Sequence, residues 1–164
     1  LSAILGVFSL IIMMIKPNKK IEISLKEMTY VSEMSLTIGI YLLTVGTFLG
    51  GMWANESWGR YWSWDPKETW AFVSVIVYAV VLHMRLVPGL RGKFAFNVAA
   101  MWAVWTVIMT YFGVNYYLSG LHSYAAGDPI PIPFWVPATA VAMLALTLAA
   151  WYLQNKVYHV KSKD

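Results

Sequence analysis

Aromatic and charged side chains are concentrated in residues 53–70, a Trp-rich segment between two apolar stretches. Five of the nine tryptophans and three of the eight acidic residues lie in it, and Gly59 and Pro66 interrupt it. Because indole rings offer wide apolar faces, this composition suits a flat, hydrophobic ligand with charged edges. The alternative is a belt of tryptophans at a membrane interface, although such a belt needs only a few per helix end. The five tryptophans are Trp53, Trp58, Trp62, Trp64 and Trp70.

Three histidines are the candidate metal ligands. His122 lies in a predicted loop on the same side as the Trp-rich segment. His83 lies inside a predicted membrane-spanning helix, where an ionisable side chain is a functional candidate by default. The alternative for His83 is a neutral imidazole that donates to a backbone carbonyl of a neighbouring helix. His159 belongs to a basic C-terminal tail, and we interpret it as a solvated surface residue.

Haem suits this set of residue types. The tryptophans offer aromatic surfaces to a porphyrin, Arg60 and Lys67 offer cations to its propionates, and an imidazole can bind its iron. His83, however, comes 13 residues after Trp70, roughly 20 Å further along a helix. Two axial imidazoles must grip opposite faces of one ring, so His83 and His122 serve two different places unless the outer loop folds inward. Each then needs a partner ligand that this sequence does not supply.

Other chemistries lack their residues. With no cysteine, the chain forms neither a disulfide nor a thiolate metal site, and it cannot itself keep iron or thiols reduced. The sequence shows no P-loop or Ser–His–acid arrangement, and a zinc site needs more nitrogen or sulfur ligands on one face. Asp65 and Glu68 could be an acid–base pair. Helix capping explains both, with Asp65 as the N-cap and Glu68 completing a capping box.

Composition places these residues in a membrane protein. The chain is 59% hydrophobic and 12% charged, with a mean hydropathy of +0.59, whereas a soluble domain is about a quarter charged. We predict an all-α, polytopic helix bundle of about five transmembrane segments, with residues 1–164 forming one domain. The net charge of +4 does not indicate nucleic-acid binding, because its distribution is explained by orientation in a membrane.

The predicted segments follow the apolar runs. Residues 1–15 form a first, short span, and we expect the chain to be the C-terminal part of a longer protein. A loop over 16–27 leads to a second span at 28–54, and the capping-box spacing of Ser24 and Glu27 offers an earlier helix start inside that loop. In the second span, Glu33 is either a carboxylate snorkelling to the interface or a buried functional group. A third span runs over 66–87. The fourth and fifth spans cover 94–117 and 135–154, with a loop over 118–134 between them.

The distribution of basic residues predicts the orientation. Ten of the twelve Lys and Arg residues lie in the loops or tail on one side, and the other side holds Arg60 and Lys67. By the positive-inside rule, the side with ten faces the cytoplasm or its equivalent. The Trp-rich segment and the His122 loop therefore share the outer face.

The stretch from Trp58 to Trp70 resembles the WWD signature of the haem-handling membrane proteins, and within them the CcsA/ResC type of cytochrome c biogenesis protein. The resemblance covers about residues 29–124 and is specific, because the signature is joined to a later Leu-His-x-Arg. Three further stretches agree with the pattern: Trp53-Ala54-Asn55-Glu56, Leu82-His83-Met84-Arg85, and Gly113-Val114-Asn115 leading to Gly120-Leu121-His122-Ser123-Tyr124.

This resemblance implies the haem transport and presentation subunit of a membrane holocytochrome c synthase, or haem lyase. In such proteins haem b reaches the outer side and is attached by thioether bonds to the Cys-x-x-Cys-His of an apocytochrome c. The implied partners are a CcsB/ResB-type membrane protein or an equivalent fused portion, the apocytochrome, haem and the lipid bilayer. The implied location is the plasma (inner) membrane with the Trp-rich and His122 loops periplasmic, or the thylakoid membrane of a plastid.

The resemblance also assigns residues. His122 matches the second of two outer histidines that ligate haem iron, and His83 matches one of two transmembrane histidines at an inner haem site. Their partner histidines are expected upstream of residue 1 and on the partner portion. Propionates are expected to meet Arg60 and Lys67. The porphyrin is expected to pack on Trp58, Tyr61, Trp62, Trp64 and Trp70.

Three other functions fit parts of the sequence. A haem exporter or transfer module without ligation activity shares the site but leaves no covalent haem. A b-type electron carrier needs a stacked pair of intramembrane histidines, and the separation of His83 from His122 argues against it. A scaffold that binds no haem uses its tryptophans as an interface belt alone.

Overall fold

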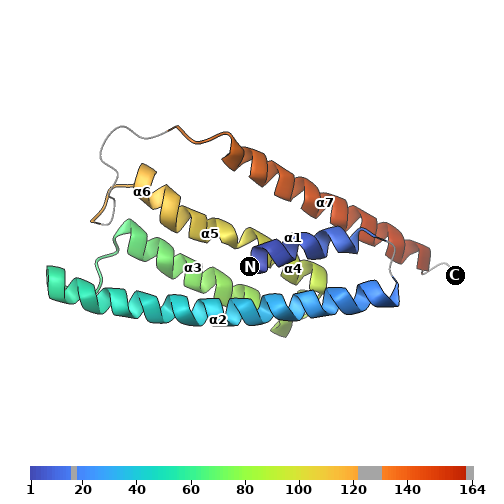
Figure 1. The fold of residues 1–164 in the computed structure, drawn as a ribbon, viewed down its shortest axis with the longest axis horizontal. Coiled ribbons are helices and arrows are strands. Elements are labelled where there is room, and N and C mark those ends of the chain that lie inside the picture. Colours follow the sequence, from blue (N-terminus) through green and yellow to red (C-terminus); the bar gives the residue numbers. More distant parts are fainter. Residues whose placement is uncertain (16–17, 122–130, 162–164) are drawn as a thin grey trace. The chain divides into compact units, whose positions relative to one another are not determined.

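The computed structural model describes residues 1–15, 18–121 and 131–161, and helices dominate this part of the chain (Figure 1). Among the described residues, four helices are long and apolar enough to cross a membrane, and a shorter apolar helix precedes them. These elements confirm the predicted all-α, multi-pass fold with a short first segment. The candidate spans are Lys19–Trp58, Pro66–Leu86, Lys93–Tyr117 and Trp135–Lys156, and the shorter helix is α1, Ser2–Met13.

Helix α2, Lys19–Trp58, begins well before the predicted start of the second span. The side-chain oxygen of Asn18 accepts a hydrogen bond from the N–H of Ile21 at 2.9 Å, so Asn18 caps the helix. The predicted loop over 16–27 is therefore wrong from residue 19 onward, because the Lys, Glu and Leu residues there are good helix formers. At 40 residues, α2 is about twice as long as a bilayer requires.

The Trp-rich segment is helical at both ends. Its first part, to Trp58, is the end of α2, and Gly59 follows with a φ of 71°. Its last part is the first turn of α3, Pro66–His83, which begins at the predicted residue. The α-helix gives way after His83 to a short 3₁₀ turn, Met84–Leu86, before the predicted end at residue 87. The connection between the two helices is thus only residues 59–65.

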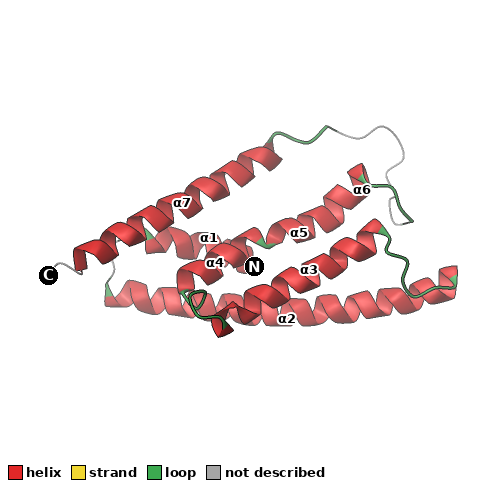
Figure 2. Cartoon of the chain, turned by 180° about the vertical axis from the view of Figure 1, so that it is seen from behind, coloured by secondary structure: helices red, strands yellow, loops and turns green. Residues whose placement is uncertain are grey.

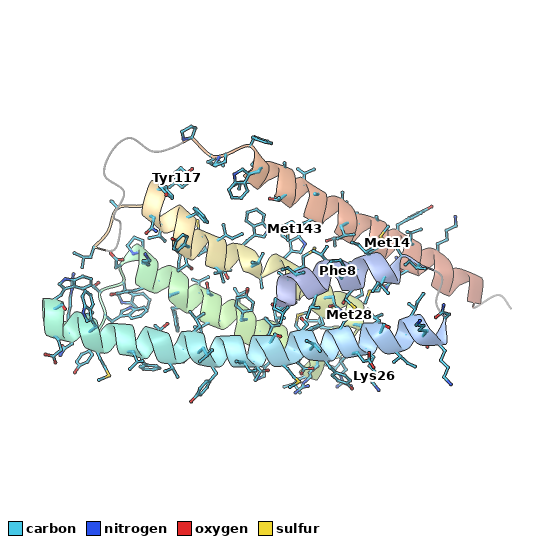
Figure 3. The ribbon with its side chains drawn as sticks, viewed as in Figure 1. Phe8, Met14, Lys26, Met28, Tyr117 and Met143 are labelled. Carbon is cyan, nitrogen blue, oxygen red and sulfur yellow. The ribbon has the colours of Figure 1, made fainter. Side chains whose placement is uncertain are left out.

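The chain forms two compact units. Unit 1 comprises residues 1–35, 84–102 and 132–164. In it, α1 packs against α4 (Lys93–Trp102) and α7 (Trp135–Lys161). Leu10, Met101 and Ala150 form its fully buried core, and Met143 of α7, labelled in Figure 3, packs against them.

Glu33 lies in unit 1 and forms an ion pair with Arg85. The side chain of Glu33 is 22% exposed, whereas that of Arg85 is 68% exposed. The carboxylate is therefore partly buried with a charged partner, and we assign it a local structural role.

Unit 2 comprises residues 36–83 and 103–131 and contains every described residue of the candidate site. In this unit α3 packs along α5 (Val104–Ile108), the π-helical turn η2 (Met109–Gly113) and α6 (Val114–Tyr117). The hydroxyl groups of Ser74 and Thr110 lie 3.3 Å apart across this contact. Figure 2 shows that two described non-helical segments of this unit, 59–65 and 118–121, lie at the same end of α3 and α6.

Candidate functional site

Asp65 caps the start of α3, as its sequence context predicts. Its Oδ2 accepts a hydrogen bond from the backbone N–H of Lys67 at 3.1 Å, and Pro66 occupies the first helical position, where the lack of an N–H costs nothing. The residue is buried, with 7% of its surface exposed. A buried carboxylate is costly unless it is hydrogen-bonded, so its other contacts matter.

Glu68 reaches further back than the predicted capping box. Its Oε2 accepts hydrogen bonds from the backbone N–H of Ser63 at 2.9 Å and from the Ser63 hydroxyl at 3.3 Å. A capping box would instead direct this carboxylate to the N–H of Asp65. The difference arises because the chain turns sharply before the cap, which brings Ser63 over the first turn of α3. Glu68 therefore shapes the connection as well as the helix start.

That sharp turn is made by Trp64, which has a φ of 58°. A bulky side chain is rarely found in this left-handed region, because its Cβ crowds the backbone. The conformation is held from both sides. The carbonyl of Trp64 accepts a hydrogen bond from the Thr69 hydroxyl at 3.2 Å, and Ser63 is held by Glu68. The side chain of Trp64 remains 68% exposed.

A large apolar cavity lies between α2, α3 and the 59–65 connection. Its volume is about 630 Å³, which is within the ~300–1,000 Å³ range of small-molecule sites. Gly51 lets the connection approach α2, because a Cβ there would lie 3.2 Å from the carbonyl oxygen of Tyr61. The lining residues are Thr44, Thr47, Phe48, Gly51, Met52, Tyr61, Trp62, Trp64, Phe72 and Val75.

Trp62 is the centre of the aromatic wall of this cavity. Its ring meets that of Trp64 edge to face at a centroid distance of 5.7 Å, and that of Phe72 at 6.2 Å. Such T-shaped pairs are each worth about 0.5–1.5 kcal/mol beyond the area they bury. The contacts tie the connection to α3, so the aromatic wall and the helix start form one structure.

The structure brings some of the predicted aromatic residues together and not others. Tyr61, Trp62 and Trp64 line the cavity. The other two aromatic residues that were predicted to pack on a porphyrin, Trp58 and Trp70, do not line the cavity. Trp58 packs instead against Trp53, at a ring distance of 5.1 Å within α2. Their contact with a porphyrin remains a prediction.

The two predicted cations have different surroundings. Arg60 is exposed on the connection. Lys67 is half-buried on α3, where it lines a second cavity of about 520 Å³ beside the first. Its ammonium group donates to the side-chain oxygen of Asn115 at 3.1 Å. An ammonium group has three donors, so a lysine can bind an anion in addition to a neutral amide oxygen.

The other oxygen of Asp65 joins this helix start to the segment after α6. Oδ1 accepts a hydrogen bond from the backbone N–H of Leu121 at 2.6 Å. Gly120 lies so close that an added Cβ would collide with Oδ1 and with the ring of Pro66. The predicted ligand His122 lies outside the described residues. Leu121, the last described residue before it, is in contact with the Trp-rich segment through Asp65.

His83 occupies the opposite end of α3. Its Nδ1 lies 2.7 Å from the carbonyl oxygen of Ala79 on the same helix, and the side chain is exposed. The 18 residues of α3 place it about 25 Å from the start of the helix. The sequence-based alternative for His83 was a hydrogen bond to a carbonyl of a neighbouring helix. The observed carbonyl partner, Ala79, belongs to the same helix as His83. Within the described parts of the chain, no group of three or more His, Cys, Asp or Glu residues forms a metal site.

Several cavity residues were not predicted from the sequence. Phe48 and Phe72 contribute rings to the lining, and neither belongs to the Trp-rich segment. A signal was present, because the α2 lining residues follow helical spacing along one face. These α2 residues are Thr44, Thr47, Phe48, Gly51 and Met52.

The fold and the site define a multi-pass, helical membrane protein with an aromatic cavity beside the start of one span. The chain belongs to the cytochrome c assembly protein family, whose model matches residues 1–122. The resemblance of the Trp-rich segment to a cytochrome c biogenesis signature is thereby confirmed, and the protein is a cytochrome c biogenesis membrane protein.

Similar proteins support the same assignment. The chain is 47% identical over 158 residues to protein NrfI of Wolinella succinogenes, an alignment that covers 93% of this chain and 18% of NrfI. It is 46% identical over 99 residues to the cytochrome c biogenesis protein CcsA of Prochlorococcus marinus, covering 60% of this chain and 31% of that protein. CcsA of Cyanophora paradoxa is 44% identical over 99 residues, again 60% of this chain and 30% of the relative. The chain therefore spans less than a third of the length of these relatives.

Proposed function

We propose that this chain presents haem, as a substrate, at the outer face of a membrane for covalent attachment to apocytochrome c. The observation that carries the proposal is the aromatic cavity of about 630 Å³ beside the Trp-rich segment. Its apolar lining and edge-to-face rings suit a planar, hydrophobic macrocycle. Membership of the cytochrome c assembly family supports haem b as that macrocycle.

The proposed chemistry is addition of a cysteine thiol across each haem vinyl group. For each vinyl group, the S–H bond and the C=C π bond break while one C–S bond and one C–H bond form. The thiol proton ends on carbon, and no electrons are exchanged with another reagent. The thiols belong to the Cys-x-x-Cys-His of the apocytochrome, because this chain has no cysteine. The chain contributes by positioning the vinyl groups against the thiols. Keeping iron and thiols reduced is a task for groups outside this chain, because it has no cysteine.

In this proposal Tyr61, Trp62 and Trp64 hold the porphyrin, and His122 ligates its iron. The support for His122 is its place in the sequence, one residue after the Leu121 amide that Asp65 binds. Arg60 and Lys67 meet the propionates, and Trp58 and Trp70 contribute further aromatic surface. The distribution of Lys and Arg supports an outer location for these residues, periplasmic in a plasma membrane or on the equivalent side of a thylakoid membrane.

His83 serves a second, inner haem position in the same proposal. When Nδ1–H donates to the Ala79 carbonyl, Nε2 carries the lone pair that a metal requires. The length of α3 keeps this position apart from the aromatic cavity. The second ligand at each position comes from the rest of the protein or from a CcsB/ResB-type membrane partner.

Covalent haem formation tests the proposal. The full parent protein, with its partner, is co-expressed with an apocytochrome c, and covalent haem is measured on the apocytochrome after denaturing electrophoresis. We expect His122→Ala to abolish attachment and added imidazole to restore it. We expect Trp62→Ala to reduce attachment about tenfold, since it removes two aromatic contacts. Trp151→Ala, at a tryptophan that is 55% exposed on α7, is the matched control.

Two results contradict the proposal in different ways. An unchanged His122→Ala variant removes the ligand assignment. Haem bound by the wild-type protein without any covalent product points to a haem exporter or transfer module, the alternative that the same cavity serves.

A further inference from the structure

The carboxylate of Asp65 binds two parts of unit 2 at once. Oδ2 caps α3 through the N–H of Lys67 at 3.1 Å, and Oδ1 accepts the N–H of Leu121 at 2.6 Å. Helix capping requires one oxygen, and serine or asparagine would serve equally well. An aspartate differs in having a second carboxylate oxygen, and here that oxygen accepts the hydrogen bond from Leu121.

We propose that Asp65 is a positioning residue that fixes the backbone of residues 120–121 against the start of α3. Its effect on haem is indirect and passes through the chain that continues from Leu121 into His122. The inference rests on the proposed function in so far as His122 is an iron ligand. The contact itself is a property of described residues alone.

Gly120 is the complementary half of this contact. A Cβ at residue 120 would collide with Oδ1 of Asp65 and would lie 2.8 Å from the Cδ of Pro66. Any side chain here would therefore push the 118–121 segment off the helix start. The Lys67 ammonium bond to Asn115 holds the preceding helix, α6, to the same turn of α3 at 3.1 Å.

Burial makes the Asp65 bond consequential. Asp65 is 7% exposed, and a charge-assisted hydrogen bond to a buried carboxylate is stronger than a neutral one. A partner that orients a metal ligand from outside the coordination shell commonly changes metal affinity by about 10–100-fold. Asp65 acts in this way through the backbone.

Asp65→Ser separates the two tasks, because a serine hydroxyl caps the helix but does not replace the second oxygen. Gly120→Ala disrupts the same contact sterically, through its added Cβ, and leaves Asp65 and its helix cap unchanged. Glu68→Gln is the matched control at the same helix start, since it removes a charge but keeps an oxygen for Ser63. Gly39→Ala is the control for the glycine change, because nothing lies within 4 Å of its added Cβ.

The first measurement is amide hydrogen exchange of residues 118–121 in the detergent-solubilised full protein, with and without haem. We expect exchange at Leu121 to rise at least tenfold in Asp65→Ser and Gly120→Ala, but not in the two controls. Unchanged exchange at Leu121 in both test variants overturns the proposal, whatever haem does.

The second measurement is the haem absorption spectrum and the yield of covalent haem. We expect about a tenfold loss in Asp65→Ser, restored by imidazole to the same extent as in His122→Ala. With imidazole added, the double variant Asp65→Ser with His122→Ala is expected to yield as much covalent haem as His122→Ala alone, because both changes act through one ligand. If exchange rises but His122→Ala is itself silent, the contact stands and the proposed role of His122 fails. A loss that imidazole does not restore overturns the positioning role and leaves Asp65 a structural cap.

Discussion

The Asp65 carboxylate and the Leu121 backbone amide lie 2.6 Å apart, although 56 positions separate them in the sequence. The bond joins the Trp-rich segment to the stretch that follows α6, and both ends of it lie in unit 2. The aromatic cavity and the backbone leading to His122 are therefore linked through one side chain. A change at the helix start is expected to affect both.

Trp64→Asn is expected to stabilise the protein and weaken haem binding together. Asparagine tolerates the left-handed φ of 58° better than a bulky ring, and strain of this kind costs about 1–3 kcal/mol. The substitution also removes a ring that lines the cavity. We expect a higher apparent melting temperature in detergent and a several-fold lower haem content.

Trp64→Phe is the matched control for that experiment. It keeps both the strained backbone and an aromatic face, so stability and haem content are expected to stay near the wild-type values. Trp64→Asn also loses the edge-to-face contact with Trp62, worth about 0.5–1.5 kcal/mol. A Trp64→Asn protein that melts no higher than wild type would show that the strain relieved does not exceed this lost contact.

Lys67→Gln and Asn115→Ala distinguish a ligand-binding cation from a structural one. The Lys67 ammonium group donates a hydrogen bond to the side-chain oxygen of Asn115 at 3.1 Å. If the ammonium also meets a haem propionate, Lys67→Gln removes a charge-assisted bond worth about 1.5–3 kcal/mol. We expect haem affinity to fall about tenfold or more in Lys67→Gln and to change little in Asn115→Ala. Equal losses in both variants would assign Lys67 to holding α6 instead.

His83→Ala is expected to lower the haem content of the full protein and to leave the spectrum of haem at the Trp-rich segment unchanged. The reason is distance, because α3 separates the two positions by about 25 Å. Absorption spectra of the oxidised and dithionite-reduced protein, with and without imidazole, provide the measurement. His159→Ala, near the end of α7, is the control. A spectrum altered in the same way by His83→Ala and His122→Ala contradicts two separate positions.

The parts of this fold that depend on local sequence could be predicted. Apolar runs located the spans, and the Asp65-Pro66 start of α3 was correct because capping involves neighbouring residues. The start of α2 does not follow from the sequence pattern, since the Asn18 cap precedes residues whose charge favours a loop. The φ of Trp64 has no local signal, because neighbouring hydrogen bonds impose it.

The contacts that build the site could not be predicted from the sequence, for a different reason. Leu121 binds Asp65 through its backbone N–H, which every residue except proline possesses, so its identity gives no indication of the bond. The α2 wall of the cavity did carry a helical spacing, but the same spacing occurs on any helix face that packs. Only the approach of the 59–65 connection to Gly51 makes that face part of a cavity.

Gly51→Val tests whether that cavity holds the ligand. A Cβ at this position would lie 3.2 Å from the carbonyl oxygen of Tyr61, and the added methyl groups would push the connection away from α2 or fill the space. Gly39→Val is the matched control in the same helix, where nothing lies within 4 Å of the added Cβ. Both changes replace glycine by the same β-branched residue in a helix, so their effects on helix propensity cancel in the comparison. We expect haem content to fall about tenfold in Gly51→Val relative to Gly39→Val, with equal helical circular dichroism. Equal haem content in the two proteins would place the ligand outside this cavity, and the Trp-rich segment would then bind haem on its exposed face.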